Sequence, residues 1–145
     1  MISRFIELGH NVNTKWESVD RDSELFSKIA LKEIQSFDIN LTLENFEKEL
    51  ADWIGQNELP QQVNPYNTFG QPPVTLFNNG HLVVDIYFWM HVDTSIHSHS
   101  FSGAFKVLFG KSLHEKFSVK PKELFSDDVM TSDVCLLDSS VLEAR

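Results

Sequence analysis

The chain has 145 residues, of which 41% are hydrophobic and 23% are charged, which is the composition of a globular protein with a single core. Its 12 basic and 21 acidic side chains give a formal net charge of -9, which argues against a general attraction to nucleic acid or to an anionic membrane surface. The sequence has no apolar run of the roughly 20 residues that a membrane-spanning helix needs, and its N-terminus lacks the apolar centre of a signal peptide. We therefore expect a soluble, cytoplasmic protein that binds neither nucleic acid nor membrane.

Residues 1–57 are expected to form a helical segment that contains two amphipathic helices. In the first, from Ser23 to Phe37, apolar side chains recur at intervals of three and four, as on one face of a helix: Phe26, Ile29, Ala30, Ile34 and Phe37. Thr42 is the expected N-cap of the second helix, and Gly55 is its expected end. The apolar face of that helix consists of Leu43, Phe46, Leu50, Trp53 and Ile54. Each helix therefore has one face that another part of the protein must cover.

Strand signals begin after a connector at residues 58–73, which is rich in Pro, Asn and Gln and favours turns and loops. The segments with strand character lie at residues 74–77, 81–92, 104–109 and 112–119. Between the first two, Asn79-Gly80 predicts a tight hairpin turn. Residues 74–145 are therefore expected to form an antiparallel β domain.

The longest predicted strand, residues 81–92, alternates between two faces. One face is apolar and consists of Leu82, Val84, Ile86, Phe88, Met90 and Val92. The other face carries His81, Val83, Asp85, Tyr87, Trp89 and His91. On this second face Asp85, Tyr87 and Trp89 are candidates for the wall of a ligand pocket, together with Phe105 from the next predicted strand. The alternatives are a sheet surface for Asp85 and a place in the core for Phe105.

Histidine is concentrated in one part of the chain, where five of the six histidines fall within 34 residues: His81, His91, His97, His99 and His114. His97 and His99 are separated by one residue, so in an extended backbone both imidazoles leave the same face and can bind one ion. Imidazole suits zinc, iron, copper and nickel. The single cysteine, Cys135, excludes an internal disulfide and a site of several thiolates. The alternative is an exposed strand edge or loop that binds no metal.

The stretch from Thr94 to Gly110 resembles the first metal-binding motif of the cupin superfamily, whose members are small β-barrels of jelly-roll type. That motif reads His-x-His, three or four residues, Glu, six residues and Gly. His97 and His99 match the histidine pair, and Gly110 matches the closing glycine. Gly103 stands where the family carries its glutamate. Within the superfamily, the Ser-Ile-His-Ser-His and Phe-Lys-Val-Leu sequences look most like the thiol dioxygenases, mononuclear iron enzymes resembling cysteine dioxygenase, which also lack the glutamate and use three histidines.

This resemblance implies an α+β protein that is mainly β, with an antiparallel cupin-type jelly-roll barrel preceded by the two amphipathic helices. It also implies a divalent metal, with Fe(II) favoured and zinc, nickel or manganese as alternatives, and a small-molecule substrate. His97 and His99 would hold the ion, with a third ligand from His91, from His114 or from residues outside this sequence. The alternatives are a hydrogen-bonded barrel position for His91 and a solvent-facing strand position for His114.

A weaker similarity lies downstream, where Ser132–Asp138 resembles the strand that opens the second half of a cupin barrel. The second cupin motif, which carries the remaining histidine ligand, does not follow, so residues 74–145 are expected to form an incomplete barrel. The leading hypothesis is a metal-dependent cupin resembling a mononuclear non-haem iron oxygenase, with its catalytic residues unassigned. The alternatives are a non-catalytic cupin that binds a ligand or forms a homodimer, a fragment of a larger enzyme, and an interaction domain whose histidines are incidental.

Overall fold

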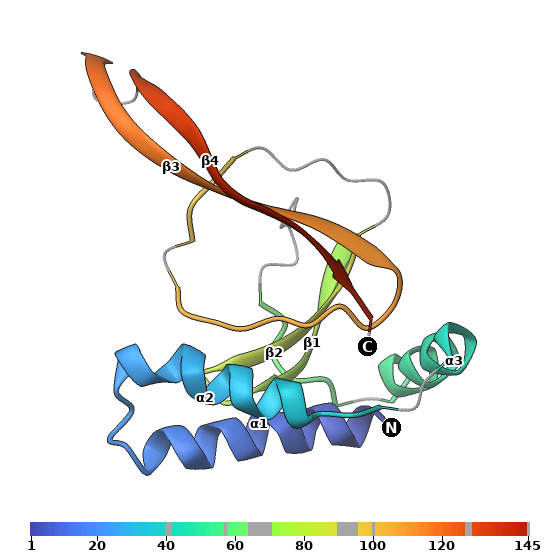
Figure 1. The fold of residues 1–145 in the computed structure, drawn as a ribbon. Helices are drawn as coiled ribbons and strands as arrows, with labels where there is room; N and C mark the ends of the chain where they lie inside the picture. Colours follow the sequence, from blue (N-terminus) through green and yellow to red (C-terminus); the bar gives the residue numbers. More distant parts are fainter. Residues whose placement is uncertain are drawn as a thin grey trace. The chain divides into compact units, whose positions relative to one another are not determined.

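The structure is a computed structural model, and it describes residues 1–39, 42–56, 58–63, 71–89, 96–99, 101–126 and 129–144. The chain divides into two compact units, Met1–Phe105 and Lys106–Arg145. Within the described ranges, the first unit contains three helices and a two-stranded sheet, and the second contains another two-stranded sheet (Figure 1). The α+β class is confirmed. Different local sequence patterns account for the helices and strands of each unit.

The first helix, α1 (Ile2–Glu17), was not expected from the sequence. Its buried residues are spaced by three and four along the chain, as the face of an amphipathic helix requires: Ile2, Phe5, Leu8, Gly9 and Val12. The positions between them are mostly polar, so the segment resembles a polar N-terminal stretch. The helical segment at residues 1–57 therefore contains three helices, one more than predicted.

The two predicted helices are confirmed as α2 (Ser23–Ser36) and α3 (Leu43–Ile54). Thr42 caps α3 as predicted, because its hydroxyl accepts a hydrogen bond from the Asn45 backbone N–H at 3.3 Å. The side chain of Asp22 caps α2 in the same way by accepting from the backbone N–H of Glu24 at 2.8 Å. None of the helices in the described ranges combines the length and the apolar content needed to cross a bilayer.

The predicted hairpin is also confirmed, as β1 (Gln71–Asn78) paired antiparallel with β2 (Val83–Phe88). Gly80 adopts a positive φ of 81°, which a residue without a Cβ tolerates, and the Asn79 side chain accepts hydrogen bonds from the backbone N–H groups of His81 and Leu82. The predicted faces hold as well, since Leu82 and Ile86 are buried. The structure does not describe residues 90–95, so the predicted end of that strand lies outside the described residues.

The core of the first unit forms around α1, which contacts α2, α3 and both strands of the β1–β2 sheet (Figure 1). Phe5 on α1 lies at its centre, with its ring centroid 5.0 Å from that of Phe37 and 6.1 Å from that of Phe46. On the other side, the Phe46 ring is 6.4 Å from that of Phe88 on β2. Helix and sheet therefore share one apolar interior, and further residues of that interior are Ile2, Leu8, Val12, Leu50, Leu76 and Phe77.

The second unit is a long antiparallel hairpin of β3 (Lys111–Ser126) and β4 (Val129–Glu143). The predicted strand at 112–119 lies within β3, and the segment Ser132–Asp138 lies within β4. The predicted strand at 104–109 is wrong, because this segment has no regular structure. Strand propensity alone does not give a strand, because a strand also needs a neighbour that completes its hydrogen-bond ladder. The described strands form two separate two-stranded sheets and no closed barrel, so the jelly-roll barrel is not confirmed.

A close approach between helix and sheet fixes the position of α1 on the hairpin. A Cβ added at Gly9 would overlap the ring of Phe77, and that ring also packs edge-on against His10 at a centroid distance of 4.8 Å. Both Gly9 and Phe77 are buried. The glycine is therefore a packing requirement at this point of α1.

We predict that Gly9→Ala destabilises the protein by about 1–3 kcal/mol, since the added methyl must displace a buried aromatic ring. The direction of this change in stability is informative, because replacing glycine with alanine inside a helix otherwise stabilises a protein by about 1 kcal/mol. Urea denaturation followed by far-UV circular dichroism measures the change, with Thr14→Ala at an exposed position of α1 as the control. A Gly9→Ala protein as stable as the wild type would contradict this packing.

Candidate functional site

His97 and His99 lie close together on the described segment 96–99, and both side chains are exposed. Their ring centroids are 4.8 Å apart and the ring planes are nearly perpendicular, at 84°. The His99 ring also contacts the ring of Phe101, with a centroid distance of 4.9 Å. The two imidazoles are thus neighbours in space, and one aromatic side chain flanks the pair.

The spacing of the two rings is compatible with a shared metal ion. A metal about 2.1 Å from one nitrogen of each ring lies about 3.2 Å from each ring centroid, and ordinary coordination angles then place the centroids about 4.5–5.2 Å apart. The observed 4.8 Å falls in that range. Among the described residues, no group of three or more His, Cys, Asp or Glu side chains gathers to hold a metal. Within the described residues, His97 and His99 therefore form a pair that no third side chain of these types joins.

Of the other two predicted ligands, His91 and His114, the structure describes only His114. His91 lies outside the described residues. His114 is exposed on β3 and belongs to the second unit, whereas His97 and His99 belong to the first. Phe105, predicted as a pocket residue, is 54% exposed and lies at the end of the first unit.

Asp85, Tyr87 and Trp89 share one side of the hairpin formed by β1 and β2, as the alternation predicts. Tyr87 and Trp89 are both exposed, with ring centroids 6.1 Å apart. Asp85 is half-buried and stands opposite Thr75 of β1. These side chains form an open aromatic surface, and none of them lines either of the two hollows described below.

Asp85 has an unusual electrostatic environment. Its Oδ1 atom is buried, and among the described residues it finds no hydrogen-bond partner. Burial raises the pKa of the Asp85 carboxyl above its ordinary value, and a hydrogen bond with the Thr75 side chain lowers it by a smaller amount. Burial, followed by the charge of Asp85, raises the pKa of the neighbouring Tyr87.

Thr75 is itself fixed by residues of the predicted connector at 58–73. Its backbone N–H donates to Gln62 Oε1 at 2.9 Å, and Gln62 Nε2 donates to the Thr75 carbonyl at 3.0 Å. The Thr75 hydroxyl accepts from the backbone N–H of Val63 at 3.2 Å. The amide of Gln62 thus bonds to Thr75 as a neighbouring strand would, and it holds in place the residue that faces Asp85.

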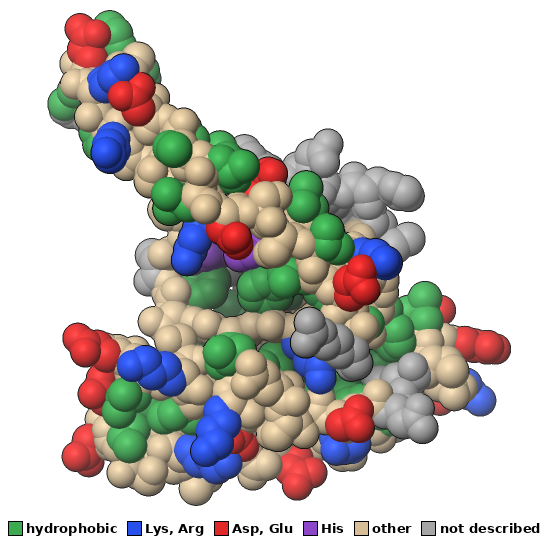
Figure 2. Space-filling model, viewed as in Figure 1, with side chains coloured by type: hydrophobic (Ala, Val, Ile, Leu, Met, Phe, Trp, Pro, Cys, Tyr) green, Lys and Arg blue, Asp and Glu red, His purple; other side chains and the backbone are tan. Residues whose placement is uncertain are grey.

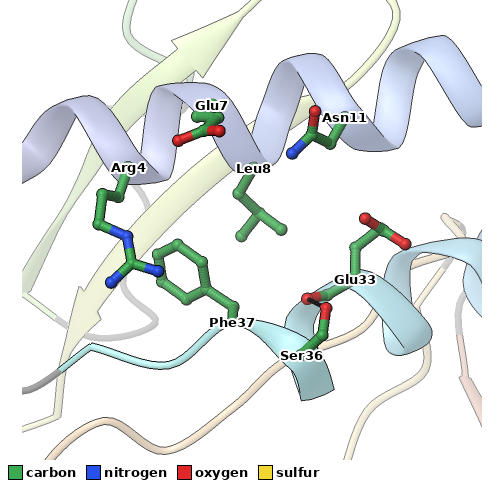
Figure 3. Close-up of a pocket in the computed structure, with 7 residues that line it drawn as sticks. All are labelled: Arg4, Glu7, Leu8, Asn11, Glu33, Ser36 and Phe37. Carbon is green, nitrogen blue, oxygen red and sulfur yellow. Dashed lines mark hydrogen bonds between the residues drawn. The ribbon is translucent and has the colours of Figure 1, made fainter.

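A polar hollow of about 130 Å³, which no sequence pattern predicts, lies between α1 and α2 (Figure 3). It is lined by Arg4, Glu7, Leu8, Asn11, Glu33, Ser36 and Phe37. Glu33 is buried and is paired with Lys15 of α1 at 2.6 Å, and the Arg4 guanidinium lies 5.6 Å from the centroid of the Phe37 ring. These contacts join the two helices. A second hollow of about 250 Å³ opens beside the N-terminus between α1 and α3.

Comparison with known proteins adds no identification, since no family model matches the chain and neither curated proteins nor solved structures gave a match.

We predict that Asp85→Asn stabilises the protein at pH 7 and that this gain shrinks as the pH is lowered. The folded-state pKa of Asp85 is raised, so folding favours the protonated carboxyl. The stabilisation that this carboxyl contributes is therefore fully present below the unfolded pKa of about 3.9, and it is lost as the pH rises through the folded pKa. Denaturation midpoints between pH 4 and pH 8 measure the effect. Asp52→Asn, at an exposed position of α3, controls for the change in net charge. An Asp85→Asn protein that is less stable at pH 7 would contradict this account.

Proposed function

We propose that the protein binds a divalent metal ion and that His97 and His99 supply the first two ligands. The observation that carries the proposal is the pair of exposed imidazoles with ring centroids 4.8 Å apart. Fe(II) is the favoured ion because the resemblance to the cupins implies it, with zinc, nickel or manganese as alternatives. Neutral imidazole suits iron, zinc and nickel. The resemblance of the segment ending at Gly110 to the first cupin motif supports the same residues.

A third ligand is needed for tight binding, and we propose His91 or His114 for this role. Gly103 supports a site made of histidines, since it leaves no carboxylate at the position where most cupins have one. A mononuclear iron held by histidines would supply redox chemistry with molecular oxygen at its open positions. In this proposal the protein is a small-molecule oxygenase of cupin type, and its jelly-roll barrel is part of the proposal.

In such a site, the chain's own residues bind and orient. The two histidines lie on exposed backbone, so solvent and a small substrate reach them from outside. The Phe101 ring beside His99 is 72% exposed and offers an apolar contact to a substrate next to the ligands. These features suit a small molecule with an apolar part and a group that binds the metal.

A second candidate function is association without catalysis, and a separate observation favours it. Many apolar side chains of the second unit are more than half exposed, although β3 and β4 have no other strand beside them in the described structure. A surface of this kind is typical of a protein interaction site. This candidate needs no metal, so the two functions can be tested separately.

We predict that the purified chain binds about one equivalent of iron or zinc and that the double variant His97→Ala/His99→Ala loses this metal, because two of its ligands are gone. Metal analysis after reconstitution and dialysis measures the content. His81→Ala, at an exposed position after the hairpin turn, is the matched control and keeps its metal. Equal metal content in all three proteins would rule out the histidine pair as the site.

The iron-loaded protein should also consume oxygen in the presence of a small thiol, and His91→Ala and His114→Ala identify the third ligand. The variant that removes this ligand loses both metal affinity and oxygen uptake. Stoichiometric iron without oxygen uptake for any small thiol would leave a metal-binding protein and refute the oxygenase.

A further inference from the structure

The β3–β4 hairpin carries most of its apolar side chains on one face along its length. Four cross-strand pairs of apolar residues make up this apolar face: Leu113 with Val141, Phe117 with Leu136, Val119 with Val134, and Leu124 with Met130. The opposite face, called the polar face, carries His114 with Ser140, Lys116 with Asp138, Ser118 with Cys135, and Lys120 with Asp133. Leu142 and Val129, near its two ends, are apolar residues on this face. The hairpin is therefore an amphipathic sheet, although its sequence does not alternate regularly.

Register shifts in the two strands create this arrangement. In a regular strand, Leu136 and Val141 would point to opposite faces, because they are five residues apart. The ladder shifts between the pairs made by Lys116 and Phe117, which leaves Leu137 without a partner in register and brings both residues to one face. A similar shift at Lys122 of β3 keeps Leu124 on the same face as Val119. Both irregularities therefore preserve one continuous apolar face.

In the structure this face is open. Seven of its eight side chains, all except Phe117, are between 50% and 65% exposed, and Figure 2 shows hydrophobic side chains on the surface of the hairpin. A two-stranded hairpin with no further layer is only marginally stable in water, because it has no interior in which to bury apolar surface. A partner that covers the apolar face would therefore stabilise the hairpin.

The distribution of charge points to a second copy of the chain as this partner. Residues 1–105 carry 14 acidic and 6 basic side chains, whereas residues 106–145 carry 7 acidic and 6 basic ones. Repulsion between two copies therefore arises mainly in the first unit, and the hairpin is nearly neutral. On the apolar face itself, the charged residues are Glu115 and, at one end, Lys111 paired with Glu143 at 2.7 Å. Such a face can lie against an identical face without bringing many like charges together.

We propose that two copies of the chain associate through the apolar faces of their β3–β4 hairpins, packed face to face about a twofold axis. A face of two strands with about 14 residue pairs measures about 45 Å by 10 Å, so two copies would bury about 900–1,000 Å² in all. This area is below the roughly 1,200 Å² at which stable specific interfaces begin and is typical of weak, transient association. The dimer is therefore expected to dissociate on dilution.

Pairing of strand edges is the competing arrangement for the second copy. β3 is protected against it by Pro121 and four lysines, which are residues that block pairing at an exposed edge. β4 has no lysine, arginine or proline. Pairing through β4 would leave the apolar faces of both copies in water, whereas packing face to face covers them. The face and the edge can be distinguished by substitutions on the two faces of β4.

The first test compares Leu136→Lys with Cys135→Lys in the full chain. The two positions are adjacent, both are exposed and they lie on opposite faces, so the charge change is matched and only the face differs. Sedimentation velocity over a range of concentrations should show the wild type and Cys135→Lys moving from 16.7 kDa to twice that mass. Leu136→Lys should raise the dissociation constant of the dimer by about tenfold or more.

The second test does not depend on a destabilising charge. Because Cys135 is the single cysteine and lies on the polar face, the double variant Leu136→Cys/Cys135→Ser moves the one thiol to the apolar face. A thiol cross-linker that spans about 10 Å, the separation of packed sheets, should link the variant to itself and leave the wild type unlinked. Circular dichroism confirms that each variant is folded.

A wild type that stays monomeric at all concentrations would overturn the proposal and would mean that the same chain or a different partner covers the apolar face. A dimer that Leu136→Lys leaves intact, or cross-linking through Cys135 alone, would also overturn it, in favour of an edge or another surface. Neither test involves metal, so a failure here is distinct from a failure of the metal-binding function.

Discussion

Phe5 is the residue on which the first unit depends most, because its ring packs against Phe37 after α2 and against Phe46 on α3. Phe46 then continues the contact to Phe88 on β2. One helix, α1, thus joins both other helices and the β1–β2 sheet into a single interior. Gly9 lets α1 approach Phe77 closely enough for this interior to form. Burial of apolar surface is the dominant favourable term in folding, and the first unit achieves it within its own residues.

In the second unit, by contrast, much apolar surface stays exposed. Its strands complete their hydrogen-bond ladder with each other, but their apolar face has no layer packed on it within the hairpin. Hydrogen bonds of this kind contribute little net stability when nothing excludes water from the side chains around them. The long hairpin is therefore best understood as one half of an interface, whereas the first unit has a core of its own.

The sequence predicted those parts of the fold in which local chemistry determines the structure. Thr42 as a cap, the turn at Asn79-Gly80 and the burial of Ile86 all follow from short-range rules, and all are found. Other features depend on distant partners. Residues 104–109 have strand character but form no strand, and the register shift at Leu137 becomes visible only once β3 and β4 are paired. Helix α1 was missed although its apolar spacing was present in the sequence.

In the candidate site too, local sequence patterns predict some features and miss those that depend on distant residues. The spacing of His97 and His99 in the sequence was enough to predict that their rings would be neighbours, and the structure places them 4.8 Å apart. A third ligand must come from elsewhere in the chain, and no local pattern identifies it. The burial of Asp85 Oδ1 could not be predicted from the sequence either. Its desolvation arises from packing around a strand position that was expected to lie in a pocket or on a sheet surface.

On this account, the first unit has an apolar core of its own, whereas the second unit depends on a partner to cover its apolar face. Amide hydrogen exchange, measured residue by residue at low and at high protein concentration, tests it most directly. Amides of α1 and of the β1–β2 sheet should be protected to the same extent at both concentrations, whereas those of β3 and β4 should become protected only at the higher one. Amides of β3 and β4 that are protected as strongly as those of α1 at the lowest concentration would contradict the account.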